Sequence, residues 1–421
     1  GALPPRELTN VAWAFARLGL RDVALLRAVG VCATPRIAEF KPQELSNLAW
    51  AFSALRVGEP GLASVIEARL TGLLSAAASQ HASGEAVQEL ARSSLGVLWS
   101  LDFVDLLSQD FLALARSTLV SIGGSLDVAC SFRLAPVLSR VPEVPSVAES
   151  PHLAMDLADR QVIQKPPGWE VDQEAGSVED LTLHKLSRYI CAQLPPRQWP
   201  LVCDARHRHG LLHRLDVPSS GLILAAKTYA AYYDLHVQLS TRGLVRDYLV
   251  LCHGRVPLRR QEVSARIHWE EAVCLSSVVL QRGKPAGTRL GVLARARYAG
   301  QAMSLLEMQL ATGRRHQIRV HTAHMGHPSA ADGRYLAATT SHSDGCWCPR
   351  NFLHRHHLAF QDGLGASQEA TASLPPDLAA ALQRLSPDDA RAADIFRGVA
   401  QERWTPMWAG EADGRSPGQA R

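Results

Sequence analysis

A charged segment that runs straight into an apolar strand is the first candidate for chemistry in this sequence. It reads His213-Arg214-Leu215-Asp216, continues through a Ser-Ser-Gly turn and enters the apolar run 221–224. Asp216 therefore lies at the edge of a rigid element, where a functional side chain is held firmly. A carboxylate there can act as nucleophile, general base or metal ligand. The alternative is an aspartate that only caps the turn, which is common for a single Asp.

A second candidate is the segment Thr312–His321. Within it Gln317, Arg319 and His321 alternate with apolar residues, and side chains two positions apart share one face of a strand. The spacing therefore predicts a strand that presents three polar side chains to a wet cleft rather than to a core.

Two shorter elements complete the set of candidate positions. Arg246-Asp247-Tyr248 begins an apolar strand, and Lys165-Pro166-Pro167-Gly168 forms a turn just after the short strand Val162-Ile163. Each places one polar side chain, Tyr248 or Lys165, at the end of a strand.

The part of the chain that carries these residues has the pattern of an α+β domain. Short aliphatic runs bounded by turn residues, at 221–225 and 247–251, predict strands. A helix is expected around Tyr229–Leu239, with further helices at Pro376–Leu385 and within Pro387–Arg403. Strands interspersed with helices in this way indicate an α+β architecture.

The first part of the chain contains an internal repeat. The segment Leu3–Phe15 recurs as Phe40–Phe52, with matched positions 37 residues apart, so that Trp13 corresponds to Trp50; a decayed third copy runs through Leu95–Leu101. Apolar side chains within a copy recur at helical spacing, and a fixed period of this length is typical of stacked helices. We expect both tryptophans to be core residues between those helices.

Composition and charge narrow the class of protein. The chain has 421 residues, 47% of them hydrophobic and 20% charged, which excludes a wholly disordered chain. No apolar run approaches the roughly 20 residues that cross a bilayer, and eight scattered cysteines form no disulfide framework. The net charge is −3 over 1–160, +10 over 161–360 and −3 over 361–421. Such a basic middle segment suits a polyanion partner, although a solvated surface fits it equally well.

These observations divide the chain into four parts. Residues 1–133 form the helical-repeat region, and residues 134–160 form a linker that several prolines punctuate. Residues 161–386 form the α+β domain. Residues 387–421 form a C-terminal helix and a disordered tail.

Seven blocks of this sequence, in order, resemble the RluA-type pseudouridine synthases. They are Lys165–Gly168, His213–Leu224, Arg246–Leu249 with His253-Gly254, Thr312–His321, Gly326–Pro328 with Asp332–Tyr335, Phe352–His354, and Leu374–Leu378. Together they extend over about residues 160–386. Seven blocks in family order are far more specific than any one of them.

The resemblance implies an RNA pseudouridine synthase whose α+β domain holds a mixed, largely antiparallel sheet. Asp216 would attack the uridine, at the base or at the ribose, so that the detached uracil turns and rejoins through C5. Tyr248 would stack on the uracil, and Arg319 would pair with Asp216 and lower its pKa. Arg214 would support the place left by the uridine, which must leave its stack to be reached. The further residues assigned to substrate binding are His213, Arg314, His316, Gln317 and Lys165.

The resemblance implies neither cofactor nor metal, because the reaction is an isomerisation without net redox change. Neither a G-x-G-x-x-G loop nor a P-loop lysine motif occurs in the sequence. The repeats are similar to the octotricopeptide-type repeats of organelle RNA-binding proteins, which favours a chloroplast or mitochondrion over cytoplasm or nucleus. The expected partner is a structured, uridine-containing RNA. We expect a monomer without membrane association.

Two other functions stay open. One is a non-catalytic RNA-binding repeat protein that uses the second domain as an RNA clamp, although a clamp has no need of an Asp–Arg pair. The other is zinc chemistry at Cys346 and Cys348 with nearby histidines, or at the cluster His207, His209 and His213. The C-x-C spacing is tighter than zinc sites usually show, and the deaminase cysteine pattern is absent.

Overall fold

The structure is a computed structural model that describes residues 3–79, 84–131, 150–171, 184–269, 276–401 and 407–408. Its helices are α1 (Pro5–Leu18), α2 (Val23–Ala33), α3 (Pro42–Ala54), α4 (Pro60–Ser79), α5 (Glu85–Phe103), α6 (Gln109–Ser131), α7 (Leu186–Gln193), α8 (Tyr229–Ser240), α9 (Gln317–His324), α10 (Ala338–Gly345), α11 (Pro376–Gln383) and α12 (Ala390–Ala400). Short 3₁₀ helices are η1 (Thr34–Glu39), η2 (Pro200–Cys203) and η3 (Ala205–Gly210). Its strands are β1 (His152–Asp156), β2 (Arg160–Lys165), β3 (Trp169–Glu170), β4 (His184–Lys185), β5 (Ser220–Ala226), β6 (Val245–His253), β7 (Glu262–Ser264), β8 (Ile267–His268), β9 (Val278–Val279), β10 (Gly287–Tyr298), β11 (Gln301–Leu310), β12 (Leu353–Gln361), β13 (Ser367–Thr371) and β14 (Ser386–Pro387).

Within the described residues, ten strands form one mixed sheet. Its order is β1-β2-β5-β12-β6-β11-β10-β14, with β13 beside β12 and β7 beside β10. The pair β5 and β12 runs parallel, whereas the other neighbours are antiparallel. This confirms the mixed, largely antiparallel sheet that the sequence predicted. The predicted strands at 221–225 and 247–251 are parts of β5 and β6.

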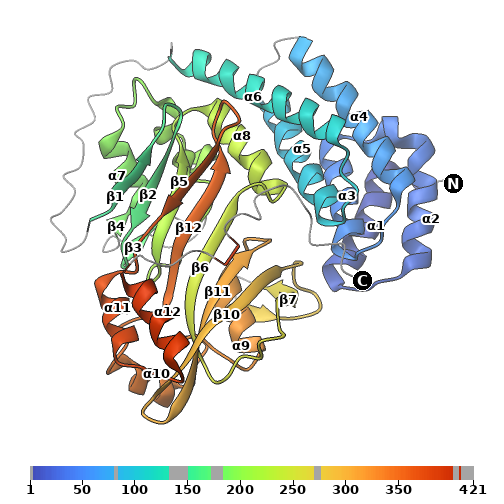
Figure 1. Ribbon diagram of the computed structural model, residues 1–421. Coiled ribbons are helices and arrows are strands. Elements are labelled where there is room, and N and C mark those ends of the chain that lie inside the picture. Colours follow the sequence, from blue (N-terminus) through green and yellow to red (C-terminus); the bar gives the residue numbers. More distant parts are fainter. Residues whose placement is uncertain are drawn as a thin grey trace.

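The first six helices gather on one side of the sheet, where Figure 1 draws them in blue to cyan. Helix α3 packs between α1 and α5, and α4 packs on α6. Helices α5 and α6 both contact α8, and α8 contacts β5 and β12. Helix α8 therefore lies between the helical region and the sheet and contacts both.

The two clear repeat copies become the equivalent helices α1 and α3, each of which starts at its matched proline. Proline suits the first helical turn, because its missing N–H has no helical partner there. Helix α1 stops at Gly19, whose φ of +73° is left-handed, and the N–H of Leu20 reaches back to the carbonyl of Phe15 at 2.9 Å. Helical copies at the right places support the predicted repeat, while its octotricopeptide type stays a prediction.

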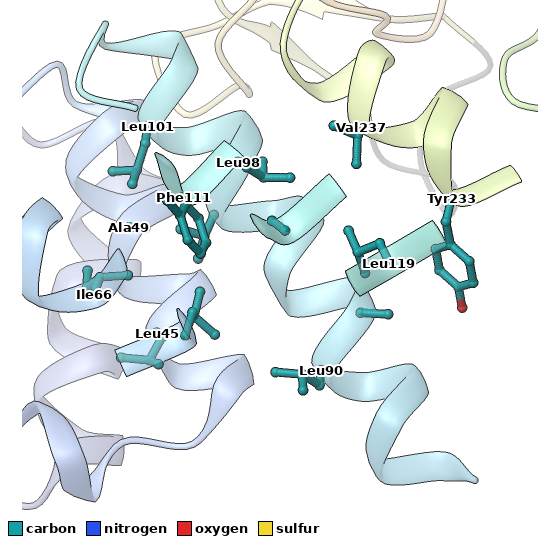
Figure 2. Packing of buried hydrophobic residues seen from close by; sticks show 14 of the residues in the cluster. Leu45, Ala49, Ile66, Leu90, Leu98, Leu101, Phe111, Leu119, Tyr233 and Val237 are labelled. Atoms are coloured by element: carbon teal, nitrogen blue, oxygen red, sulfur yellow. The ribbon is translucent and has the colours of Figure 1, made fainter. Parts of the chain in front are cut away.

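One hydrophobic core runs from the helical region into the α+β domain. Figure 2 shows Leu45 of α3, Leu98 of α5 and Leu119 of α6 leading to Tyr233 and Val237 of α8. Each of these side chains is buried, and full burial of a large apolar side chain contributes roughly 1.5–3 kcal/mol. The helices are therefore part of the folded body of this protein rather than a separate appendage.

Where the linker ends is a correction to the sequence prediction. The linker was expected to reach residue 160, but β1 already pairs with β2 from His152 onward. Strand β1 is an edge strand with mostly exposed side chains, so it lacks the apolar pattern that marks the central strands. The rest of the predicted linker, residues 132–149, lies outside the described residues. The helices expected near the C-terminus are confirmed as α11 and α12.

Two helices of the first region also differ from expectation. By length and composition alone, α4 and α6 are long and apolar enough to cross a membrane. Helix α6 binds α8 through polar groups: Arg116 pairs with Asp234 at 2.7 Å, and Asp127 accepts the backbone N–H of Tyr229 at 2.8 Å. These contacts fix α6 within the protein, beside the sheet.

Candidate active site

The loop that carries Asp216 is fastened from two sides. The N–H of Ser219 donates to the carbonyl of Asp216 at 3.0 Å, and the N–H of Gly168 donates to the carbonyl of Val217 at 2.8 Å. The ammonium of Lys165, fully buried, reaches the same Val217 carbonyl at 3.3 Å and those of residues 166 and 169 at 2.9 and 2.8 Å. Burial lowers the pKa of Lys165 to about 7. The lysine turn thus positions the Asp216 loop.

The second residue of the strand after this loop, β5, is a glycine for a steric reason. Gly221 has a φ of +124°, and a Cβ built there would lie 2.2 Å from the carbonyl oxygen of Arg355. Strands β5 and β12 are parallel neighbours at this point, with Gly221 opposite Arg355. Only glycine permits both the backbone angle and the close approach.

Asp216 belongs to a chain of three charged groups. Its Oδ2 accepts from Nη1 of Arg319 at 2.8 Å, and Arg319 in turn binds both carboxylate oxygens of Asp332, at 2.8 and 2.7 Å. Asp332 is fully buried, whereas the Asp216 side chain is 13% exposed. The buried partner fixes the guanidinium, and the guanidinium aims the accessible carboxylate.

A histidine approaches the other oxygen of the same carboxylate. Nε2 of His316 lies 3.8 Å from Oδ1 of Asp216, and its Nδ1 lies 2.9 Å from the hydroxyl of Tyr335. That hydroxyl also accepts the N–H of Ser277 at 2.9 Å. Burial lowers the pKa of His316 to about 4. The ring is therefore neutral near pH 7, and its Nε2 atom is the one that faces Asp216.

The electrostatics keep Asp216 ionised. Burial alone would raise its pKa, but three groups together outweigh burial and hold the pKa of Asp216 below its ordinary value. They are His316, which becomes charged at the acid pH where Asp216 titrates, Arg319 and Arg214. Arg319 stays positively charged over the whole pH range in which Asp216 titrates. Burial lowers the pKa of Arg319, but its hydrogen bonds and ion pairs with Asp332 and Asp216 outweigh burial and raise that pKa. The site holds a carboxylate anion that water reaches only partly.

Tyr248 is held by a buried arginine that the sequence analysis missed. Arg355 is 1% exposed and lies opposite Tyr248 in the register of β6 and β12. Its Nε donates to the Tyr248 hydroxyl at 2.9 Å, and Nη2 donates to the same oxygen. Nη1 donates to Nδ1 of His213 at 2.7 Å and to the Leu222 carbonyl at 2.8 Å, and Nη2 to the Arg214 carbonyl at 3.1 Å. All five N–H groups are used, none on a carboxylate.

Comparison with known proteins places this chain in a family. Residues 161–324 match the sequence family described as RNA pseudouridylate synthase. The chain is 34% identical over 230 residues to ribosomal large subunit pseudouridine synthase D of Nitrosomonas europaea, over 53% of this chain and 62% of that protein. It is 36% identical over 185 residues to ribosomal large subunit pseudouridine synthase C of Escherichia coli, over 42% and 56% respectively. It is 32% identical over 228 residues to the uncharacterized RNA pseudouridine synthase YlyB of Bacillus subtilis, over 54% of this chain and 70% of that protein.

The chain belongs to the RluA-type RNA pseudouridine synthases. The alignment spans less than two thirds of the two ribosomal synthases. Helices α1 to α6 lie before the matched segment, which starts at residue 161. The matched residues 161–324, here called the synthase segment, contain Asp216, Tyr248 and Arg319, whereas Asp332 and Arg355 follow the segment.

One element of the synthase segment contradicts the sequence prediction. The segment expected to present Gln317, Arg319 and His321 from a strand is helix α9. Gln317 and His321, four residues apart, both reach the Thr288 hydroxyl, at 2.9 Å each. Arg319 points the other way, to Asp216. An alternation of polar and apolar residues that covers only 317–321 fits a helix as well as a strand. In the helix, Gln317 and His321 lie on one face and Arg319 lies on another.

The other predicted substrate residues take different places in this synthase. Arg214 contributes its charge beside Asp216, and its carbonyl accepts from Arg355. His213 is buried on Arg355, and Gln317 is buried under β10. Arg314 lies over the ring of Trp99, 5.1 Å from its centroid, and its Nε donates to the carbonyl of Pro285 at 2.9 Å.

The residues weighed for zinc are also placed. Cys346 is exposed and Cys348 buried, and burial raises the pKa of Cys348 to about 12. His207 binds Asp204 at 2.8 Å, and His209 binds the Val202 carbonyl at 2.8 Å. Within the part of the chain that the structure describes, no group of three or more His, Cys, Asp or Glu side chains is placed to hold a metal ion.

Arg355→Lys is expected to weaken both fold and activity of this synthase. Lysine keeps the charge but offers one nitrogen where the planar guanidinium makes five hydrogen bonds. Loss of buried partners at Tyr248 and His213 costs about 2–4 kcal/mol of unfolding free energy. We expect at least about a tenfold loss of activity through misplacement of Tyr248. Urea unfolding measures the loss of stability, and single-turnover rates measure the loss of activity. The matched control is Arg391→Lys, on the exposed side of α12. An equal effect of that control would contradict the role of Arg355 in holding Tyr248 and His213.

Proposed function

We propose that this protein converts uridine to pseudouridine in RNA, with Asp216 as its catalytic residue. The observation that carries the proposal is the partly exposed Asp216 carboxylate held at 2.8 Å by Arg319, which is anchored in turn on the buried Asp332. An anion fixed in this way is aimed and ionised before the substrate arrives. Family membership supplies the reaction class.

The reaction needs only groups that this chain provides. The Asp216 carboxylate attacks the uridine, at the base or at the ribose, and the bond between N1 and C1′ breaks. The detached uracil turns until C5 faces C1′, the new C–C bond forms, and the bond to Asp216 breaks. C5 then loses its proton and N1, freed by the broken glycosidic bond, takes one up, so the net change is one proton moved from C5 to N1. Tyr248 is the group proposed to stack on the uracil and to assist the loss of that proton. Atoms and charge balance without water, oxidant or cofactor.

The target uridine must be extruded from its stack before Asp216 can reach it. Base flipping costs a few kcal/mol, which the protein recovers through contacts with the extruded nucleotide. Arg214, whose charge lies beside Asp216, is proposed to support the vacated position. The excess of basic residues between 161 and 360 is proposed to bind the phosphates, with the salt dependence that counterion release imposes.

An RNA-wide modification map tests the proposal. The protein is incubated with unmodified large-subunit ribosomal RNA first, because the names of two relatives specify that substrate, and then with organellar and cytosolic RNA. Chemical labelling that stops reverse transcription locates each pseudouridine. New reverse-transcription stops at defined uridines support the proposal that the protein is an RNA pseudouridine synthase. RNA binding without any new stop would instead favour the clamp function.

A further inference from the structure

A cleft of about 360 Å³ opens between the helical region and the synthase segment. Its helical side carries Trp13 of α1, Trp50 of α3 and Trp99 of α5. Its synthase side carries Lys284 and Arg314. The volume lies in the range of ligand sites, and both parts of the chain are needed to form it.

The tryptophans of this cleft are not simply core residues. Trp13 is 42% exposed, which contradicts the expectation that it is buried between stacked helices, and Trp50 and Trp99 are only partly buried. The repeat explains their alignment, because Trp13 and Trp50 occupy matched positions on neighbouring helices. A row of accessible indole rings provides flat surfaces on which unstacked bases pack.

Cations accompany each end of the row. The guanidinium of Arg17 lies 5.4 Å from the Trp13 ring centroid, and that of Arg314 lies 5.1 Å from the Trp99 ring centroid. Lys284 adds an exposed ammonium group. Among the described residues that line the cleft, none is acidic. Aromatic faces interleaved with cations, without opposing anions, match the chemistry of a single-stranded nucleic acid.

The cleft is held in shape by a joint made through backbone groups. Arg266 of the synthase segment donates to the carbonyls of Ala16 and Ala54, at 3.0 and 2.5 Å, and so binds the C-terminal ends of α1 and α3 together. Its Nε donates to the Gly283 carbonyl at 2.8 Å, next to Lys284. Gln281 donates to the carbonyl of Gly19 at 3.1 Å. One arginine thus fixes two of the tryptophan helices against the edge that carries Lys284.

The cleft and the catalytic site share a segment of chain. Arg314, which faces Trp99, is two residues before His316, whose Nε2 lies 3.8 Å from Asp216. Arg315, between them, lies 4.3 Å from the ring centroid of Trp269. A strand of RNA that extends from a uridine at Asp216 therefore has a path of cations and rings toward the cleft.

We propose that the tryptophan cleft binds unstacked bases in a single-stranded segment of the RNA substrate, adjacent to the modified uridine. This inference rests on the proposed function for its choice of RNA as ligand. The helical region then selects substrates that have an unpaired flank, and it does so by stacking rather than by base pairing.

A labelled 12-nucleotide oligoadenylate measures the cleft apart from catalysis, because it contains no uridine to isomerise. Anisotropy titration of the full chain with Trp13→Ala is expected to show roughly 5- to 150-fold weaker binding, the worth of one stacked base. Trp13→Phe retains a ring and should restore most of the affinity. Lys284→Gln should also reduce the slope of log K against log salt by about 0.7, whereas Arg27→Gln, exposed on α2, should change neither quantity.

The outcomes separate this inference from the proposed function. Two results would contradict RNA binding by the cleft even if the protein isomerises uridine. One is an unchanged affinity for oligoadenylate in both Trp13→Ala and Lys284→Gln, and the other is no binding of oligoadenylate by wild type at low salt. If the variants bind oligoadenylate more weakly but wild type forms no pseudouridine, the result supports RNA binding by the cleft and contradicts the proposed catalytic function. On an RNA that is modified, Trp13→Ala should raise KM and leave kcat unchanged.

Discussion

Asp216→Asn protein should form no pseudouridine while it folds and binds RNA like wild type. The amide keeps the size of the side chain and an oxygen that accepts from Arg319, but it cannot act as the attacking carboxylate. Loss of a nucleophile lowers turnover by on the order of 10⁴-fold or more. Single-turnover reaction with the mapped RNA, quenched over hours, measures the residual rate.

Two controls make that result specific to Asp216. Asp362→Asn removes another loop carboxylate, one that accepts backbone N–H groups of Leu364 and Ala366 far from the site, and it should retain full activity. Thermal unfolding of Asp216→Asn should stay within a few degrees of wild type, because Arg319 keeps its pair with Asp332. Turnover in Asp216→Asn comparable to wild type would exclude Asp216 as the nucleophile.

Arg319→Met should be the most damaging single change outside the attacking residue. It leaves the fully buried Asp332 and the partly buried Asp216 without their shared cation. Breaking a buried ion pair by removing one partner costs about 3–5 kcal/mol. Activity should fall at least about 100-fold, because the carboxylate is neither aimed nor held ionised. Urea unfolding at pH 7 and initial rates measure the two effects.

The pH dependence of activity tests whether Arg319 lowers the pKa of Asp216. In wild type the lowered pKa of Asp216 keeps the carboxylate charged to below its ordinary range, so activity persists as the pH falls. Without Arg319, burial raises that pKa, and the acidic limb of the rate profile moves to higher pH. Arg319→Lys should show an intermediate shift. An unchanged acidic limb in residual Arg319→Met activity would contradict the ion-pair role.

A double substitution separates stability from catalysis. Arg319→Met with Asp332→Asn removes the uncompensated buried carboxylate, so part of the lost unfolding free energy should return. Activity should not return, because Asp216 still lacks its cation. Recovery of activity in the double variant would mean that Arg319 serves the fold alone.

Local patterns identified the strands β2, β5 and β6 and the helices α1, α3, α8, α11 and α12, because each of these patterns depends on nearby residues. The central strands β5 and β6 are buried along most of their length, and such runs are visible in any short window. Helix α9 was mistaken for a strand because its polar residues also alternate by two. Edge strand β1 was missed because its side chains face solvent.

The site itself depended on contacts that no local pattern shows. Asp216 and Arg319 are 103 positions apart, and their pairing was expected only from the family resemblance. Asp332 was part of a recognised block but had no assigned role, and Arg355 directly follows another block without being part of it. A charged residue in the middle of a buried strand, such as Arg355, is a signal that would have identified it, because such a charge needs several partners.

Arg266 has a consequence for how this protein can diverge. It contacts α1 and α3 only through the carbonyl groups of Ala16 and Ala54, which lie in the last helical turn, where carbonyls have no N–H partner four residues on within the helix. Side chains on those helices can therefore change without loosening the joint. If the tryptophan cleft binds RNA as proposed, substitutions on these two helices change which RNA it prefers while the geometry around Asp216 stays the same.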